Sequence, residues 1–166
     1  MIKLVNLLKE AEGETPKCPI ATQNIEVNLE HRQKAIDEYG YGPLNPNNPN
    51  IKFWKAKADE WQLDSIEEAK SSRCNNCAAF NITSRMLNCI EKGITSGEVE
   101  VPVAEGEEPT APVVEPETDD TEGAEKDAWN TIEAGKLGYC TFLKFKCAGS
   151  RTCDSWVVGG PIKDKK

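Results

Sequence analysis

The sequence is poor in several kinds of residue, and each shortage excludes a class of protein. No stretch of about 20 apolar residues occurs, so we expect no membrane-spanning helix. Basic residues number 20 against 28 acidic ones, and phosphate binding needs clustered Lys and Arg, so we expect no nucleic-acid partner. The only histidine is His31, in a short charged segment, and no glycine-rich phosphate loop is present. These shortages argue against an enzyme.

The first residues also lack the features of an export signal. The apolar run over 1–8 is very short, contains one basic residue and is not followed by a small-residue cleavage pattern. We therefore expect a protein of the cytoplasm or of a virion. Disulfides are not the default state of cysteine in a reducing compartment, so the seven cysteines favour metal binding.

Negative charge is concentrated in one segment. Residues 98–126 contain eleven acidic residues and a single base, Lys126, so this segment carries −10 and the rest of the chain about +2. Residues 96–126 also contain four prolines and no aromatic residue. Such a composition cannot bury enough apolar surface to fold, so we predict a disordered acidic insert at 96–126.

The remaining sequence predicts short elements grouped into three further parts. We assign an N-terminal helix and extended arm to 1–49, the helical part and first half of a cysteine-rich domain to 50–95, and its second half to 127–166. Apolar spacing and capping residues predict helices over 2–12, 29–39, 51–62, 66–72 and 83–92, and β-prone runs over 141–147 and 155–158. The predicted fold is a small irregular α+β domain with short helices and a few short strands around a cysteine-ligated centre.

Cysteine spacing predicts that centre. Cys74 and Cys77 form a C-x2-C pair, in which two thiolates on one turn face a shared metal. A second group of Cys140, Cys147 and Cys153 has six and five intervening residues, which is too open for a second zinc knuckle but adequate for a larger cluster. An iron–sulfur cluster is therefore favoured over zinc, and zinc stays the alternative beside an all-disulfide scaffold.

The other cysteines have weaker assignments. We interpret Cys18, which lies apart from the rest, as a bystander thiol. Cys89 and Cys147 are predicted to be either buried thiols or one disulfide. A thioredoxin-type redox enzyme needs a βαβ setting, and none surrounds Cys74.

The motifs around these cysteines resemble those of high-potential iron–sulfur proteins. Those proteins show C-x2-C followed by an aromatic residue, then Gly-aromatic-Cys, then Cys-x-x-Trp, and this chain has matching runs at 74–80, 138–142 and 153–156. The resemblance implies a single 4Fe–4S cluster. It assigns four cysteines as ligands and four aromatic residues as the shell around the cluster: Cys74, Cys77, Cys140 and Cys153, with Phe80, Tyr139, Phe142 and Trp156.

The chain departs from the family pattern in length. The 62 residues between Cys77 and Cys140 replace a short connection, and the N-terminal 70 residues have no counterpart. The resemblance implies single-electron transfer with a redox partner protein. A weaker resemblance to small cysteine-rich proteins of bacteriophages implies the alternative: a virion or assembly component whose cluster, or zinc ion, is a structural staple for its own small core, while the N-terminal arm binds neighbouring subunits.

Overall fold

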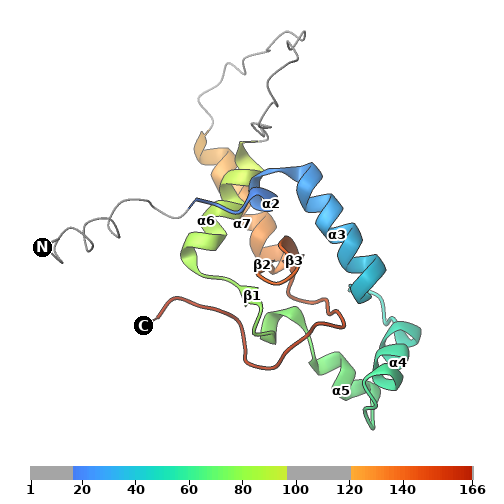
Figure 1. Ribbon diagram of the computed structural model, residues 1–166. Coiled ribbons are helices and arrows are strands. Elements are labelled where there is room, and N and C mark those ends of the chain that lie inside the picture. The colour runs from blue at the N-terminus through green and yellow to red at the C-terminus, as the bar shows by residue number, and fades with distance from the viewer. Residues whose placement is uncertain (1–16, 97–120, 166) are drawn as a thin grey trace, which may run out of the picture.

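The structure is a computed structural model, and it describes residues 17–96 and 121–165 of the 166-residue chain. Six helices, a short 3-10 turn and three strands occur in the described ranges (Figure 1). In chain order they are α2 (Ile20–Gln23), α3 (Ile25–Tyr39), α4 (Ile51–Glu60), α5 (Ile66–Ser71), η1 (Cys74–Asn76), β1 (Phe80–Asn81), α6 (Ser84–Thr95), α7 (Thr121–Gly135), β2 (Leu137–Cys140) and β3 (Phe145–Ala148). The predicted small mixed α+β class is confirmed.

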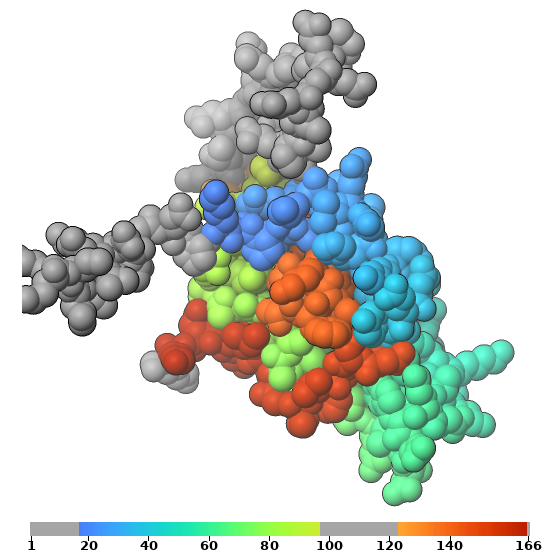
Figure 2. Space-filling view, in the orientation of Figure 1, coloured from blue at the N-terminus to red at the C-terminus, as the bar shows by residue number. Residues whose placement is uncertain are grey.

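The strands form one antiparallel sheet in the order β1-β2-β3. Phe80 pairs with Cys140 on one side of β2, and Cys140 pairs with Phe145 on the other. The β2–β3 hairpin lies between the α2–α3 segment and the C-terminal segment on the face drawn in Figure 2. The pairing therefore brings together the two cysteine-rich parts of the sequence.

Side-chain capping explains where several helices begin. Asn24 accepts a hydrogen bond from the N–H of Val27 at the start of α3, and Ser65 and Thr83 cap α5 and α6 in the same way. The helix predicted over 29–39 therefore begins earlier than predicted, at Ile25. Asn28 lies inside the helix, and its side-chain oxygen accepts a hydrogen bond of 2.7 Å from the N–H of Lys146 in β3. This bond attaches α3 to the sheet.

Two predicted segments lie outside the described residues: the helix predicted over 2–12 and residues 97–120 of the predicted insert. The last part of the predicted insert, 121–126, is helical and opens α7, so that boundary was wrong. The rest of α7 then buries Ala128 and Ile132. Helical periodicity continues from the acidic residues into the apolar ones without a break, so composition alone misplaced the boundary.

The alternation of side chains along β2 and β3 separates two buried groups. Phe80, Phe145 and Cys147 share one face of the sheet with Ala35 and Tyr41, which come from α3 and the segment after it. The described part of the predicted arm, 17–49, therefore contributes to this core. Tyr139, which points to the opposite face, packs with the second group, whose other buried members are Ala21, Met86 and Cys89.

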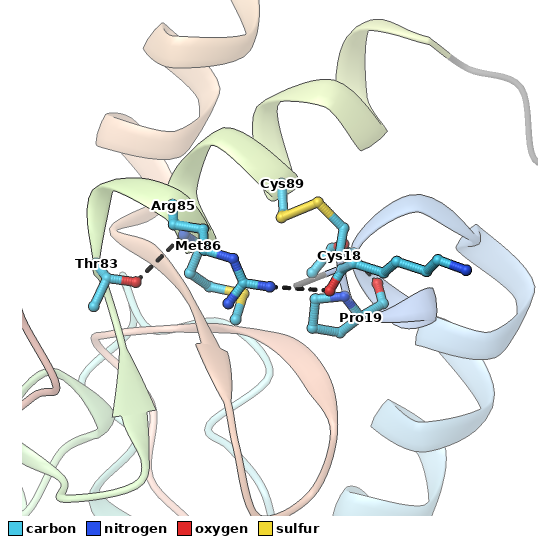
Figure 3. Close-up of a disulfide and its surroundings, with 8 residues drawn as sticks. Cys18, Pro19, Thr83, Arg85, Met86 and Cys89 are labelled. Atoms are coloured by element: carbon cyan, nitrogen blue, oxygen red, sulfur yellow. Dashed lines mark hydrogen bonds between the residues drawn. A yellow bond between two sulfur atoms is a disulfide. The ribbon is translucent and has the colours of Figure 1, made fainter. Parts of the chain in front are cut away.

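A disulfide joins Cys18 to Cys89 within this second group (Figure 3). It links the segment before α2 to the middle of α6, and the Arg85 side chain donates a hydrogen bond of 3.0 Å to the carbonyl of Lys17 beside it. The interpretation of Cys18 as a bystander was wrong, and so was the possible pairing of Cys89 with Cys147, which is a free, buried thiol. Nothing in the sequence distance of 71 residues indicates this pairing.

The described helices include none that is long and apolar enough to cross a membrane.

A close approach of α2 to α6 depends on Gly93. A Cβ at this position would overlap the carbonyl of Thr22, which is backbone and cannot move aside. We predict that Gly93→Ala lowers the free energy of unfolding by about 2 kcal/mol or more, although alanine is favoured over glycine in a helix interior by about 1 kcal/mol. Urea denaturation tests this. Asn88→Ala, at an exposed position of the same helix, is the matched control, and an equal change in the two variants would contradict the assigned contact.

The disulfide should contribute to stability by restricting the unfolded chain. We predict that the double variant Cys18→Ala, Cys89→Ala loses about 2–4 kcal/mol of unfolding free energy. Alkylation of the denatured wild-type chain, followed by peptide mass analysis, should find these two cysteines blocked until a reductant is added. Labelling of both cysteines without reductant would contradict the bond.

Candidate functional site

Five free cysteines line a single pocket on the first face of the sheet. The space that no protein atom fills measures about 320 Å³, counted out to the mouth of the pocket. The wall consists of all five thiols, three aromatic residues, one alanine and one serine. These residues are Cys74, Cys77, Cys140, Cys147 and Cys153, with Phe80, Phe142, Trp156, Ala79 and Ser155. All four cysteines predicted as ligands are therefore brought together.

The first half of the pocket is a tight turn. Cys74 begins η1, and the N–H of Cys77 donates a hydrogen bond of 2.9 Å to the Cys74 carbonyl, so both thiols come from one turn. The N–H of Cys74 itself donates to the Arg151 carbonyl at 2.7 Å. Hydrogen bonding between backbone groups thus holds the first half-site against the loop that carries Cys153.

The second half uses three different settings. Cys140 ends β2, Cys147 lies in the interior of β3, and Cys153 lies in the following loop. The N–H of Leu143 donates to the sulfur of Cys140 at 3.3 Å, and the thiol of Cys153 donates to the hydroxyl oxygen of Ser155 at 3.7 Å. The bond from Leu143 stabilises negative charge on Cys140, and the hydrogen bonding of Ser155 lowers the pKa of Cys153.

Burial favours the protonated form of the three thiols in the second half of the pocket, Cys140, Cys147 and Cys153. Loss of hydration raises the pKa of Cys140, and raises that of Cys153 to about 11 against the opposing effect of the Ser155 hydrogen bond. Cys147 shares a hydrogen bond with Cys74, and this bond together with burial raises the Cys147 pKa well above its usual value. Neighbouring thiolates raise all three pKa values further, which shows that the sulfurs lie close enough to repel one another once charged.

The predicted aromatic shell is present for three of its four members. Phe80, Phe142 and Trp156 line the pocket, whereas Tyr139 lies on the opposite face of β2. The Trp156 Nε1–H donates to the Arg73 carbonyl at 2.9 Å and to the Asn76 side-chain oxygen at 3.0 Å. This indole therefore joins the second half-site to the first.

A charged contact attaches α4 to the same region. Lys57, with only 7% of its side chain exposed, pairs with Asp154, the residue after Cys153, and with Glu60 at 3.2 Å. Lys57 also lies 5.8 Å from the Phe53 ring centre. Because Asp154 lies in the loop of the last thiol, α4 helps to fix the position of that loop.

The lone histidine lies outside this pocket. His31 is on α3, and its Nδ1 is 2.6 Å from the Lys144 carbonyl, which lies in the turn between β2 and β3. The side chain therefore fastens α3 to the hairpin.

Within the described ranges, no group of three or more His, Cys, Asp or Glu side chains is arranged to hold a metal ion. A zinc ion needs four sulfurs drawn to about 2.3 Å from one point. A 4Fe–4S cluster requires its cysteines to surround a larger body, and the donor set here is five soft thiols around a pocket. Soft thiolate donors of this kind are ligands for both iron–sulfur clusters and zinc.

Comparisons of this chain with protein-family models, curated proteins and solved structures found no match.

Cys147 was placed in the second cysteine group but not in the ligand set, and Ser155 was not assigned to the site. Cys147 has no counterpart in the family pattern, yet it alternates with the buried Phe145 along β3, and this period of two indicates that both face inward. Ser155 follows Cys153 by two residues, and no sequence signal distinguishes its role. A hydroxyl two residues from a cysteine is too common to indicate a hydrogen bond to sulfur.

The indole hydrogen bonds give a direct test of how the two half-sites are joined. We predict that Trp156→Phe, which keeps an aromatic ring but loses both bonds, lowers the free energy of unfolding by about 1–2 kcal/mol. Trp61→Phe is the matched control, because no hydrogen bond from the Trp61 indole occurs in the described residues. Equal urea midpoints for Trp156→Phe and the wild type would contradict the stabilising role of the two indole hydrogen bonds.

Proposed function

We propose that this protein binds one 4Fe–4S cluster through Cys74, Cys77, Cys140 and Cys153 and takes part in single-electron transfer. The observation that supports this most directly is the pocket in which these four thiols, from segments up to 79 residues apart, meet beneath aromatic side chains. A bound cluster supplies a one-electron redox centre.

The surrounding residues suit such a centre for two reasons. Phe80, Phe142 and Trp156 restrict water, and water access affects both the potential and the survival of iron–sulfur clusters. The N–H of Leu143 directed at Cys140 and the hydrogen bonding of Ser155 to Cys153 favour the thiolate forms of these two residues. Both features act through the protein's own groups and are present before any cofactor binds.

Cys147 is the thiol that we leave out of the ligand set. Its side chain lies in the interior of β3, is only 2% exposed and shares a hydrogen bond with Cys74. We propose that it remains a thiol and donates its proton to the Cys74 sulfur, as the N–H of Leu143 donates to Cys140.

Phe142 is suited to the exchange of electrons with a partner protein. It lines the pocket, yet 57% of the residue is exposed, so it lies between the thiols and the solvent. Its ring also makes an edge-on contact with Tyr39 at 5.9 Å, which holds it in place. A partner that covers Phe142 would come close to the proposed centre.

A structural role for the same cluster is supported by the composition of the core. Four of the eight buried residues that surround the pocket are cysteines, where a core of this size would ordinarily use larger aliphatic residues. A metal centre that joins them would stabilise a domain with little other apolar filling. A virion or assembly component whose cluster is a staple therefore remains the second candidate.

The ligand assignment is tested by anaerobic purification followed by iron and sulfide analysis. We predict about four irons and four sulfides per chain with a broad absorption band. Alanine variants of each of the four ligands should lose most of the iron, whereas Cys147→Ala should keep it. The double variant Cys18→Ala, Cys89→Ala is a second control that removes cysteines outside the pocket.

Each other result has a definite meaning. One zinc per chain without colour would favour a zinc-stapled interaction module, and loss of iron in Cys147→Ala would put the fifth thiol into the ligand set. Reversible voltammetry of the loaded protein would support the electron carrier. A cluster that raises the melting temperature but gives no reversible wave would support the staple.

A further inference from the structure

A second pocket, at the edge of the sheet beside β3, is lined by three cationic side chains. Arg32 comes from α3, Lys146 from β3 and Arg151 from the loop after β3. Its unfilled space measures about 740 Å³, counted out to the solvent, which is within the range of small-molecule sites. The other lining residues, from the helices and strands around it, are Asn28, Tyr41, Ile94, Thr131, Leu137 and Ala148. None of the lining residues is acidic.

The three cations have no acidic partner among the described residues. The four ion pairs found there involve Lys34, Lys57 and Lys70 only. Lys146 donates to the Thr22 carbonyl at 3.3 Å, and one terminal nitrogen of Arg151 donates to the Leu44 carbonyl at 3.0 Å. These neutral partners leave the positive charge uncompensated, in a chain whose net charge is −8.

Hydrogen-bond donors in the pocket are also left over. The Nε atom of Arg151 is buried and has no hydrogen-bond partner among residues 17–96 and 121–165. The Tyr41 hydroxyl, in a residue 4% exposed, accepts the N–H of Ala148 at 3.0 Å, and burial raises its pKa well above the usual value, so it keeps a proton to donate. A buried donor without an acceptor is costly, so each such group in a native protein calls for a partner.

We propose that this pocket binds a phosphate-type oxyanion, either free phosphate or the phosphate group of a small ester. Arginine forks bind two oxygens of such an anion, while lysine contributes a point charge. Three cations match a dianion better than a single carboxylate, and the Tyr41 hydroxyl supplies a neutral donor beside them. The site is distinct from the thiol pocket, because Lys146 and Ala148 alternate along β3 with the inward-facing Phe145 and Cys147.

Burial already lowers the pKa of the Lys146 amine, which is the effect expected for a cation without a counter-ion. An anion in the pocket would stabilise the protonated amine and so raise the pKa of Lys146.

Calorimetric titration of the full-length protein with inorganic phosphate at pH 8, with ionic strength held constant by sodium chloride, tests the proposal. Arg32→Gln should weaken binding roughly tenfold, the effect of losing one charge-assisted hydrogen bond. Lys34→Gln is the matched control, because it removes the same charge from the same helix outside this pocket, and it should change the affinity by less than about twofold. Titration with glycerol 3-phosphate in parallel distinguishes free phosphate from an ester.

A second variant tests the geometry and not only the charge. Arg151→Lys keeps the positive charge but removes the buried Nε–H, so it should also weaken phosphate binding several-fold. In the wild type, the Nε–Hε signal of Arg151 in nitrogen-15 spectra should shift on addition of phosphate, with acetate at equal ionic strength having little effect. No saturable binding to either phosphate compound, equal weakening by Lys34→Gln, or an equal response to acetate would overturn the proposal.

Discussion

The antiparallel pairing of β1 with β2 and of β2 with β3 is the constraint on which the rest of the structure depends. It places Phe80 opposite Cys140 and Gly138 opposite Cys147, so that parts of the sequence separated by about sixty residues meet at fixed spacing. The close pairing needs Gly138, since a Cβ there would collide with the ring of Phe80. Because successive side chains point to opposite faces, the same strands also decide which chemistry each face carries.

This alternation separates two kinds of cysteine chemistry in one small domain. On one face, Cys140 and Cys147 join the other free thiols of the pocket; on the other, Tyr139 packs beside the Cys18–Cys89 disulfide. Because Cys18 and Cys89 are bonded to each other, these two residues are not free thiols that exchange with the pocket cysteines or compete with them for metal. A disulfide and a thiol-lined pocket are therefore compatible here because the sheet stands between them.

Much of the architecture could be predicted from local patterns, and the errors have physical causes. Helices α4 and α5 begin at the predicted residues 51 and 66; Ser65 caps α5 with its side chain, whereas Asn50 precedes α4 without a side-chain capping bond. The family resemblance placed Tyr139 in the aromatic shell, but consecutive side chains in a strand point to opposite faces, and Tyr139 packs on the face away from Cys140. The disulfide and the cationic pocket depend on contacts between distant segments, which single-sequence patterns do not contain.

The long connection between Cys77 and Cys140 also has a structural explanation. Helices α6 and α7 occupy most of the described part of this connection and lie side by side in Figure 1, so the chain leaves β1, passes through both helices and returns to β2 beside its starting point. Ile90 of α6 and Ile132 of α7 are almost wholly buried. The two helices of this connection therefore build apolar contacts of their own, while the pairing of β1 with β2 keeps the two ends of the connection together.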